Sequence, residues 1–203
     1  MFYKTSEPHG LPRDPFKSLI VPRPIAWVST VSADGTVNLA PFSFFNGLAD
    51  SPPAVMIACN GPHAEGGVKD TLANIEATGE FVVNIVTWEL REAMNQTSAS
   101  LPRNVDEMAL AGLDPAPARL VRPPRVAASP AQLECTRHET VALPSNRPDW
   151  PNTVIIGLVV GIHISDEILT DGMVDMSKFR PLARLGYMDY CVVDNHFTME
   201  RPQ

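Results

Sequence analysis

Hydroxyl and amide side chains interrupt an apolar stretch near the start of the chain. Residues 23–31 read RPIAWVSTV and residues 38–46 read NLAPFSFFN, with Asp34-Gly35 between the two runs. Asp-Gly between two β-prone runs predicts a hairpin, because the tight turn needs residues at positive φ. Such a hairpin places polar groups beside a flat apolar wall, which is what a planar, phosphorylated cofactor such as FMN requires.

Three hydroxyls lie on the expected strands of this hairpin, which we place at residues 25–31 and 37–45. Ser29 and Thr30 are on the first strand, and Ser43 is on the second. If they face a ligand, their hydroxyls and the backbone N–H groups can bind the phosphate or the ribityl chain of FMN. The alternative is that strand serines and threonines simply suit a half-solvated sheet face.

Aromatic residues surround the third hydroxyl. Strand alternation would put Phe42 and Phe44 on one face and their neighbours on the other. One face would be core, and the other could lay an aromatic surface, with Trp27 beside it, against the isoalloxazine ring of a flavin. Asn46 or backbone groups would then meet the pyrimidine edge of that ring. A packed barrel interior explains the same residues equally well.

A second candidate anion site is the sequence Lys69-Asp70-Thr71, at the start of an expected helix over residues 71–77. Asp70 or Thr71 is the expected N-cap, and Gly79 is a C-terminal stop. The amino end of a helix presents unpaired N–H groups and about half a positive charge, so it binds anions. With the Lys69 ammonium and the Thr71 hydroxyl it could hold a phosphate. The alternative is an ordinary capped helix with a solvated lysine.

Other catalytic arrangements are not indicated by the spacing of residues. The five histidines are His9, His63, His138, His163 and His196, and none shows metal-ligand spacing. His138 beside Glu139 could donate a proton near a flavin, although a histidine in a loop or at a strand end is simpler. We therefore expect no metal and no catalytic side chain, with the chemistry carried by the cofactor.

Composition limits the class of protein. The 203 residues fit one domain, covering 1–203, with enough bulk for a core. A net charge of −7 with no basic block argues against a nucleic-acid binder. Three scattered cysteines, the absence of an apolar leader and the lack of a membrane-length apolar run lead us to expect a cytoplasmic protein with reduced thiols.

Short strands bounded by prolines dominate the rest of the chain, which has 20 prolines. We expect strands at residues 25–31, 37–45, 54–59, 81–86, 132–143, 153–165 and 190–193, and helices at 71–77, 88–96 and 104–112. Glycines within 153–165 predict bulges, Asp171-Gly172 predicts a turn, and residues 115–130 read as a connector. An all-β dominated fold with short helices, and no G-x-G-x-x-G motif, favours an antiparallel barrel over a doubly wound sheet.

The ordered motifs together resemble a known family. They are RPIAWVST at 23–30, NLAPFSFFN at 38–46, PPAVMIA at 52–58, KDTLANI at 69–75, VDEMALAGL at 105–113 and RPLARLGY at 180–187. This series is similar to the flavin reductase-like family with the FMN-binding split barrel. Within it, the chain looks like the branch associated with flavoprotein oxygenases and the reductase component of nitrilotriacetate monooxygenase. The likeness runs from about residue 13 to about residue 194.

The resemblance implies a six-stranded Greek-key barrel and a homodimer with FMN at the subunit interface. The residues that fall where relatives bind the cofactor are Ser29, Thr30, Ser43, Asn46, Cys59, Asn60, Lys69, Asp70, Thr71 and Arg184. Arg184 could reach the site from the partner subunit. Of these residues, Ser43, Asn46 and Cys59 would lie nearer the ring.

The activity that the resemblance implies is NAD(P)H:flavin oxidoreduction, with reduced flavin handed to a partner oxygenase or another acceptor. Hydride would pass from a reduced nicotinamide, NADH or NADPH, to flavin N5. No nicotinamide-binding signature is visible in the sequence. Two alternatives therefore stay open: a flavoprotein that holds FMN for electron transfer or storage without a fast NAD(P)H step, and a non-enzymatic binder of another planar molecule.

Overall fold

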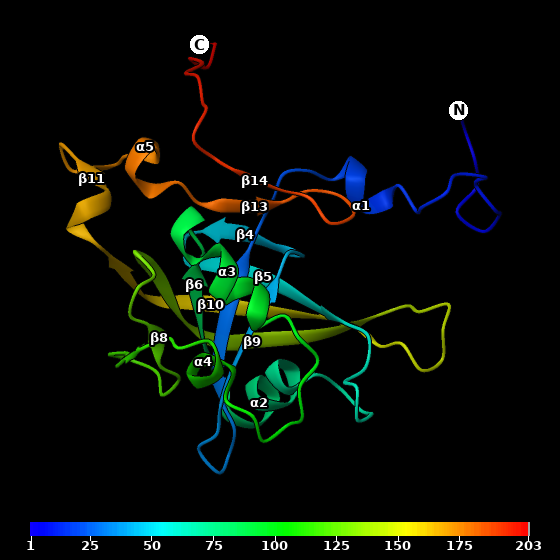
Figure 1. Cartoon of the computed structure of the whole chain (residues 1–203), viewed down its shortest axis with the longest axis horizontal. Helices are drawn as coiled ribbons and strands as arrows, with labels where there is room; N and C mark the ends of the chain where they lie inside the picture. Colours follow the sequence, from blue (N-terminus) through cyan, green and yellow to red (C-terminus); the bar gives the residue numbers. More distant parts are fainter. Residues whose placement is uncertain (203) are drawn as a thin grey trace.

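The computed structural model describes residues 1–202, and its centre is one antiparallel sheet of seven strands (Figure 1). Their order is β3-β2-β6-β9-β10-β5-β4. Their bounds are β2 Ala26–Val31, β3 Val37–Phe42, β4 Phe45–Asp50, β5 Pro53–Asn60, β6 Glu80–Ile85, β9 Ala131–Leu143 and β10 Asn152–Ile164. The expected β-dominated antiparallel fold is confirmed.

The hairpin is confirmed, but its second strand is shorter than expected. β2 and β3 pair antiparallel, with Ser29 opposite Leu39, and Gly35 in the turn has φ 96°. The strand expected to continue to residue 45 stops at Phe42, because the chain bends at residues 43 and 44 and resumes as β4. The expected sharing of one face by Phe42 and Phe44 is therefore wrong, since the bend breaks the alternation.

The bend at residues 43 and 44 closes the sheet into a barrel. β3 and β4 are the two edges of the seven-stranded sheet, yet only residues 43–44 separate them in the chain. Two residues can span no more than roughly 10 Å between the strands they join, so the two edges must meet at this point. The sheet is a barrel for this reason, and it has seven strands rather than the six that the resemblance implied.

Side chains of β2 alternate between two apolar clusters. Val28 lies in the barrel interior with Ile57 and Phe81, whereas Trp27 lies in a second cluster between the barrel and the helices on its outer face. Both faces of this strand are buried as a result. Burying a large apolar side chain contributes about 1.5–3 kcal/mol, so these clusters fix the register of the central hairpin.

The bulges predicted from the glycines of the longest strand are confirmed. The register of β10 against β9 shifts between Ile156 and Gly157, and again between Val159 and Gly161. A side chain at position 157 would collide with the ring of Phe81, so glycine lets the strand pass over that ring.

The expected helix over residues 71–77 is α2, Asp70–Thr78, and it ends at Gly79 in the left-handed conformation with φ 74°. Leu72 and Ile75 pack into the barrel cluster, as the sequence indicated. The expected N-cap, Asp70 or Thr71, is wrong. Lys69 occupies that position with extended backbone, and no side-chain hydrogen bond caps the helix.

Smaller elements complete the chain. They are α1 Phe16–Leu19, β1 Arg23–Pro24, a 3-10 turn Trp88–Leu90, α3 Arg91–Gln96, α4 Glu107–Leu110, β7 Pro115–Ala116, β8 Arg125–Val126, a 3-10 turn Asp166–Ile168, β11 Leu169–Thr170, β12 Met173–Val174, α5 Met176–Phe179, β13 Leu182–Arg184 and β14 Tyr190–Val192. The helix expected over 104–112 is only the single turn α4, because Asp106 caps it late. The turn at Asp171-Gly172 is confirmed between β11 and β12.

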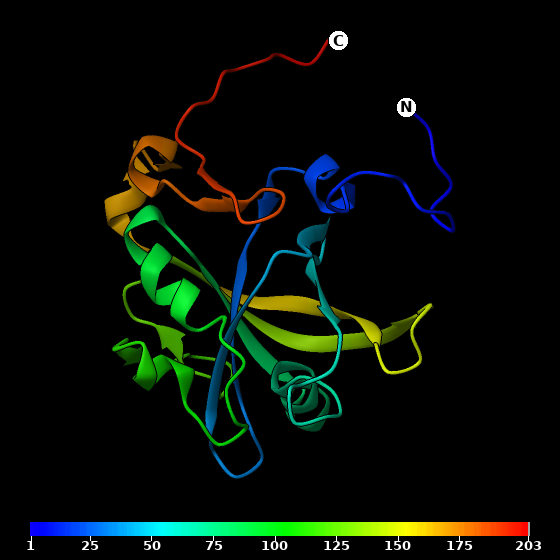
Figure 2. The same cartoon turned by 45° about the vertical axis from the view of Figure 1, so that its right-hand side comes forward.

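A three-stranded sheet, β1-β13-β14, brings the two ends of the chain together. Arg23 lies opposite Arg184, and the carboxyl-terminal strands cross above the barrel (Figure 1). The termini emerge on the same end of the molecule in both views (Figure 2). None of the helices in residues 1–202 has both the length and the apolar character needed to cross a membrane.

Candidate functional site

A groove runs across the bend between β3 and β4. It consists of two adjoining cavities that share Pro41 and Ser98. One cavity, of about 130 Å³, lies at the amino end of α2, and we refer to it as the α2 end. The other, of about 340 Å³, lies beside β13, and we refer to it as the β13 end. Together they are of the size typical of small-molecule sites.

The α2 end is built around an uncapped helix terminus. Lys69, Asp70 and Thr71 all line it, together with Asn38 from the hairpin. Because no side chain caps α2, its first N–H groups are available to an anion in the cavity. The Thr71 hydroxyl accepts a hydrogen bond of 3.0 Å from Asn38 Nδ2, which leaves its own hydrogen free to donate.

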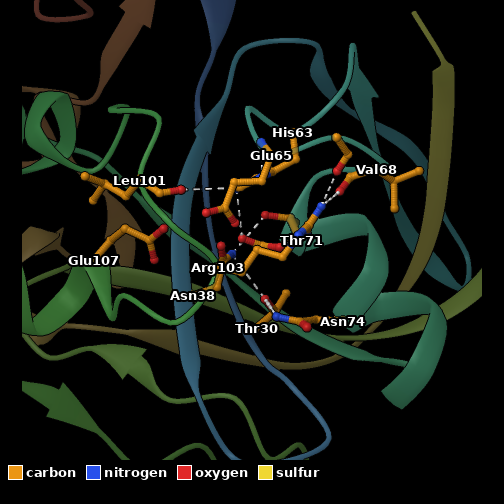
Figure 3. A network of polar contacts seen from close by, with 12 residues as sticks. Thr30, Asn38, His63, Glu65, Val68, Thr71, Asn74, Leu101, Arg103 and Glu107 are labelled. Carbon is orange, nitrogen blue, oxygen red and sulfur yellow. Dashed lines mark hydrogen bonds and ion pairs between the residues drawn. The ribbon is translucent and has the colours of Figure 1, made fainter. Parts of the chain in front are cut away.

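A buried amide network fixes that threonine (Figure 3). Asn38 Nδ2 also donates to Thr30 Oγ1 at 3.2 Å, and Asn74 Nδ2 donates to the same oxygen at 3.0 Å. Thr30 is fully buried. Thr30 therefore links the hairpin to α2 through Asn74. It also positions Asn38, which bonds Thr71, although Thr30 itself does not line the groove.

The Asp70 carboxylate has two partners, of which Arg103 supplies the opposite charge. Arg103 pairs with Asp70 Oδ1 and also donates to the carbonyl oxygens of Gly66 at 2.6 Å and Val68 at 3.0 Å. His63 Nε2 lies 3.5 Å from Asp70 Oδ2. Asp70 thus serves to anchor the loops around the α2 end, and the ammonium of Lys69 is not cancelled by its neighbour.

The tautomer of His63 follows from its contacts. Its Nδ1 accepts a hydrogen bond of 3.0 Å from the Glu65 N–H, so the proton of the neutral ring is on Nε2. That Nε2–H can then donate to the Leu101 carbonyl oxygen, 3.1 Å away. His63 therefore holds the loop of residues 97–101 against the groove.

A buried carboxyl forms the back wall of the α2 end. Glu107 is 8% exposed and accepts a hydrogen bond of 3.0 Å from the Leu39 N–H. Burial raises the pKa of Glu107 above its usual range, against the opposing effect of that hydrogen bond.

The β13 end is cationic. Lys17, Arg23 and Arg184 line it, and among the described residues no acidic side chain does. Burial, and then the charge of Arg184, lower the pKa of Arg23. Its guanidinium is held by the carbonyl oxygens of Ile20 at 2.6 Å and Leu185 at 2.7 Å. Three cations in one cavity form a field that favours negative charge.

Five of the residues that the sequence singled out line the groove. They are Ser43, Lys69, Asp70, Thr71 and Arg184. Ser43 Oγ lies 3.5 Å from Arg23 Nε at the bend, and the Arg184 guanidinium lies 4.3 Å from the centre of the Tyr190 ring. The structure thus brings the expected helix terminus, the hairpin and the RPLARLGY motif to one place.

Three residues of the first strand lie below the groove instead. Trp27 is fully buried in the outer cluster, and Ser29 donates to the Pro124 carbonyl oxygen at 2.5 Å while it accepts from Asn84 Nδ2 at 3.2 Å. Neither of these two residues lines the groove, and Thr30 does not line it either. Both faces of β2 are covered, so its hydroxyls are satisfied within the protein.

The remaining candidates lie elsewhere. Asn46 is exposed on β4, where its side chain accepts from the Gly47 N–H at 3.0 Å. Cys59 is buried in the barrel cluster, where burial raises the pKa of its thiol to about 12. Asn60 ends β5 opposite Asn152. None of the three lines either cavity of the groove.

Several groove residues escaped the sequence-based prediction. Arg23 begins the RPIAWVST motif and Asn38 begins the NLAPFSFFN motif, and both line the groove. Their guanidinium and amide groups could have been predicted as ligand-binding groups from the sequence. His63 and Ser98 come from loops, and no pattern in the sequence indicates that these loops face the hairpin.

Comparisons with known proteins agree with this architecture. The sequence profile of the "Flavin reductase like domain" matches residues 18–183. An uncharacterized protein of Aquifex aeolicus is 41% identical over 169 residues, which are 83% of each chain. Among solved structures, nitrilotriacetate monooxygenase component B from Bacillus cereus is similar with a TM-score of 0.88 and 29% identity, over 98% of both chains.

A second solved structure identifies the type of barrel. A putative flavin reductase with a split barrel domain from Shewanella frigidimarina has a TM-score of 0.80 and 23% identity, over 92% of this chain and 90% of that one. The rolled seven-stranded sheet is therefore a split barrel. From the profile match and the 41% identical relative, the chain belongs to the flavin reductase-like domain family.

Proposed function

We propose that this protein binds FMN in the groove and acts as an NAD(P)H-dependent flavin oxidoreductase. The observation that carries the proposal is the pairing of an uncapped helix terminus bearing Lys69 with a cation-lined cavity, joined across Pro41 in a flavin reductase-like chain. One end suits a phosphate, and the other suits a ring that gains negative charge when it is reduced.

The phosphate of FMN fits the α2 end. Lys69 and Thr71 line this cavity at the start of α2, so the first N–H groups of the helix, the Lys69 ammonium and the Thr71 hydroxyl are the groups that would bind the phosphate. Ser98 and Ser100 add hydroxyls from the opposite wall. Because the Arg103 guanidinium offsets the charge of Asp70, the Lys69 ammonium and the first N–H groups of α2 can attract an anion to this cavity.

The ring of FMN fits the β13 end. Pro41 supplies an apolar edge at the junction, and Ile25, Met94 and Tyr190 add apolar surface. Arg23 and Arg184 lie where they could offset negative charge at the N1–C2=O edge of the ring. The chain thus supplies binding, orientation and electrostatics, as a cofactor enzyme requires.

FMN when bound supplies the group that accepts a hydride from a reduced nicotinamide. The residues of the groove would hold the two rings in contact and exclude water from between them. No side chain of the groove has to act as an acid or a base in this scheme. NADH and NADPH are both candidate donors.

We propose further that the chain is one domain spanning residues 1–203 and acts as a homodimer with FMN at the subunit interface. Exposed apolar residues border the β13 end, and Met188 (76% exposed) and Tyr187 (44% exposed) are two of its lining residues. A partner subunit would cover them. Since the similar Bacillus cereus protein is a monooxygenase component, an oxygenase is a candidate acceptor of the electrons.

The test is the visible spectrum of the purified protein with FMN, before and after NADH or NADPH is added without oxygen. The proposal requires loss of the flavin absorbance within seconds with one of the two donors. A flavin that stays oxidised would instead favour a storage or electron-transfer flavoprotein. Failure to quench the fluorescence of added FMN would favour a binder of another planar molecule.

A further inference from the structure

A third cavity, of about 380 Å³, adjoins the β13 end on its far side from α2. We refer to it as the α3 cavity, because it lies between α3 and the strands β13 and β14. Five residues line both it and the β13 end: Met94, Asn95, Arg184, Met188 and Tyr190. A molecule held in the α3 cavity would therefore touch whatever occupies the β13 end.

The walls of the α3 cavity are largely apolar and aromatic. Leu182, Met94 and Val192 form much of its lining, with Trp88 and Tyr190 at the sides. Trp88 is 40% exposed and Tyr190 is 37% exposed, so both rings have surface that a ligand could cover. Aromatic side chains that are reachable inside a concave site bind flat rings well.

Two guanidinium groups border this aromatic surface. Arg91 lies 3.9 Å from the centre of the Trp88 ring, and Arg184 lies 4.3 Å from the centre of the Tyr190 ring. Each guanidinium is thus supported by an aromatic side chain. Such guanidinium groups recognise carboxylate or phosphate oxygens through paired N–H groups.

Internal contacts leave part of each guanidinium available. Arg91 Nη1 donates to the Trp88 carbonyl oxygen at 2.8 Å, and Arg91 Nε lies 3.4 Å from Glu92 Oε1. Arg184 Nη2 donates to the Tyr187 carbonyl oxygen. A guanidinium carries five N–H donors, so several of them remain for a ligand on each side of the cavity.

We infer that the α3 cavity is the site of the second substrate and that it takes a flat aromatic ring carrying an anionic group. The ring lies among Trp88, Tyr190 and Met94, and the anionic group meets Arg91. This inference rests on the proposed function, because the shared residues place such a ligand beside a flavin in the β13 end. Two sources share this chemistry: the adenylate half of a dinucleotide, and an aromatic carboxylic acid.

The test is calorimetric titration of the protein, with and without FMN, using two anionic probes and their neutral analogues. Adenosine 5′-monophosphate is compared with adenosine, and benzoate with benzamide. The variant Arg91→Gln removes the guanidinium that lies outside the flavin groove. Arg147→Gln is the matched control, because Arg147 lies 3.8 Å from the centre of the Trp150 ring in an equivalent pair that lines neither the groove nor the α3 cavity.

We expect at least one anionic probe to bind more tightly than its neutral analogue, and Arg91→Gln to weaken that binding about tenfold. Arg147→Gln should leave it unchanged. Binding of the adenylate alone identifies a dinucleotide, and binding of benzoate alone identifies an aromatic acid. The inference is overturned if neither anion binds, if charge makes no difference, or if Arg91→Gln has no effect.

The same experiment separates this inference from the proposed function. Wild-type protein that takes up no FMN contradicts the proposed function, while the probes still measure the α3 cavity in the FMN-free protein. Protein that takes up FMN but binds neither probe contradicts the second-substrate site alone.

Discussion

The indole Nε1–H of Trp27 donates a hydrogen bond of 2.8 Å to Oγ1 of Thr97, and both residues are almost wholly buried. Thr97 lines the α2 end and begins the segment whose Ser98 lies at the junction of the groove. One hydrogen bond thus joins β2, the first strand of the hairpin, to the loop that forms the opposite wall of the groove. Trp27 reaches the site through this loop and not through its own ring surface.

Thr97→Val should destabilise the protein. The substitution keeps the shape of the side chain but leaves the Trp27 N–H buried without an acceptor, which costs about 1–3 kcal/mol. Urea unfolding followed by circular dichroism measures the loss. Thr198→Val, at an exposed position, is the control and should change little. Equal stabilities of the two variants would show that the bond does not hold the loop.

Lys69→Ala should weaken FMN binding by about 1–3 kcal/mol, the range for a charged hydrogen bond. The effect should be specific to the phosphate, because Lys69 lies at the α2 end. Fluorescence titration with FMN and with riboflavin, which has no phosphate, measures both affinities. Lys4→Ala, at an exposed surface position, is the control.

The riboflavin comparison decides how that result is interpreted. Riboflavin affinity that is unchanged in Lys69→Ala supports a phosphate contact. Riboflavin affinity that falls as much as FMN affinity would show that Lys69 acts on the ring or on the fold.

Stability should fall in acid because of one buried carboxylate. Glu134 is fully buried and accepts hydrogen bonds from the N–H groups of Arg119 at 2.8 Å and Leu120 at 2.6 Å. His163 Nε2 also lies 2.5 Å from Glu134 Oε1. Burial alone would raise the pKa of Glu134, but these hydrogen bonds lower it below its usual range.

The lowered pKa of Glu134 determines how the stability of the protein changes with pH. A carboxylate with a lowered pKa in the folded state stabilises the protein above its ordinary pKa of about 4.3, and this stability is lost as the pH falls further. Glu134→Gln should cost about 1–3 kcal/mol at pH 7 and progressively less below about pH 4. Urea unfolding across this range, with exposed Glu139→Gln on the same strand as control, measures it. A cost that does not change with pH would contradict the assignment.

Arg184→Gln should make bound FMN harder to reduce. Arg184 lines the β13 end, and its positive charge favours the more negative, reduced form of the flavin. We expect the two-electron midpoint potential to fall by about 10–30 mV, where 30 mV corresponds to about 1.4 kcal/mol. Spectroelectrochemistry measures the potential, with Arg147→Gln as the control. A potential that does not change would place the charge away from the ring.

Much of the fold could be predicted from local patterns. The Asp-Gly turn, the alternation of the flanking runs and the glycine that ends α2 each depend on neighbouring residues alone. The bend at Ser43 could not be predicted in this way, since FSFF continues a strand pattern. The bend is required because β3 pairs with β2 whereas β4 pairs with β5, and these pairings join residues that are distant in the sequence.

The candidate site could be predicted only in part for the same reason. Lys69 and Thr71 were found because a helix terminus is a local feature. Whether Ser29 and Thr30 face a ligand depends on what covers β2. Ser29 bonds the Pro124 carbonyl oxygen, and Thr30 bonds Asn74 of α2, so both partners are distant in the sequence. The pairing of Asp70 with Arg103 joins residues 33 positions apart, and no spacing in the sequence indicates it.

The most direct test of the FMN groove is a crystal structure of the protein with FMN bound. We predict the phosphate within hydrogen-bonding distance of Lys69 and the first N–H groups of α2, with the ring extending past Pro41 toward Arg184. A phosphate held elsewhere, with both ends of the groove free of FMN, would contradict the account.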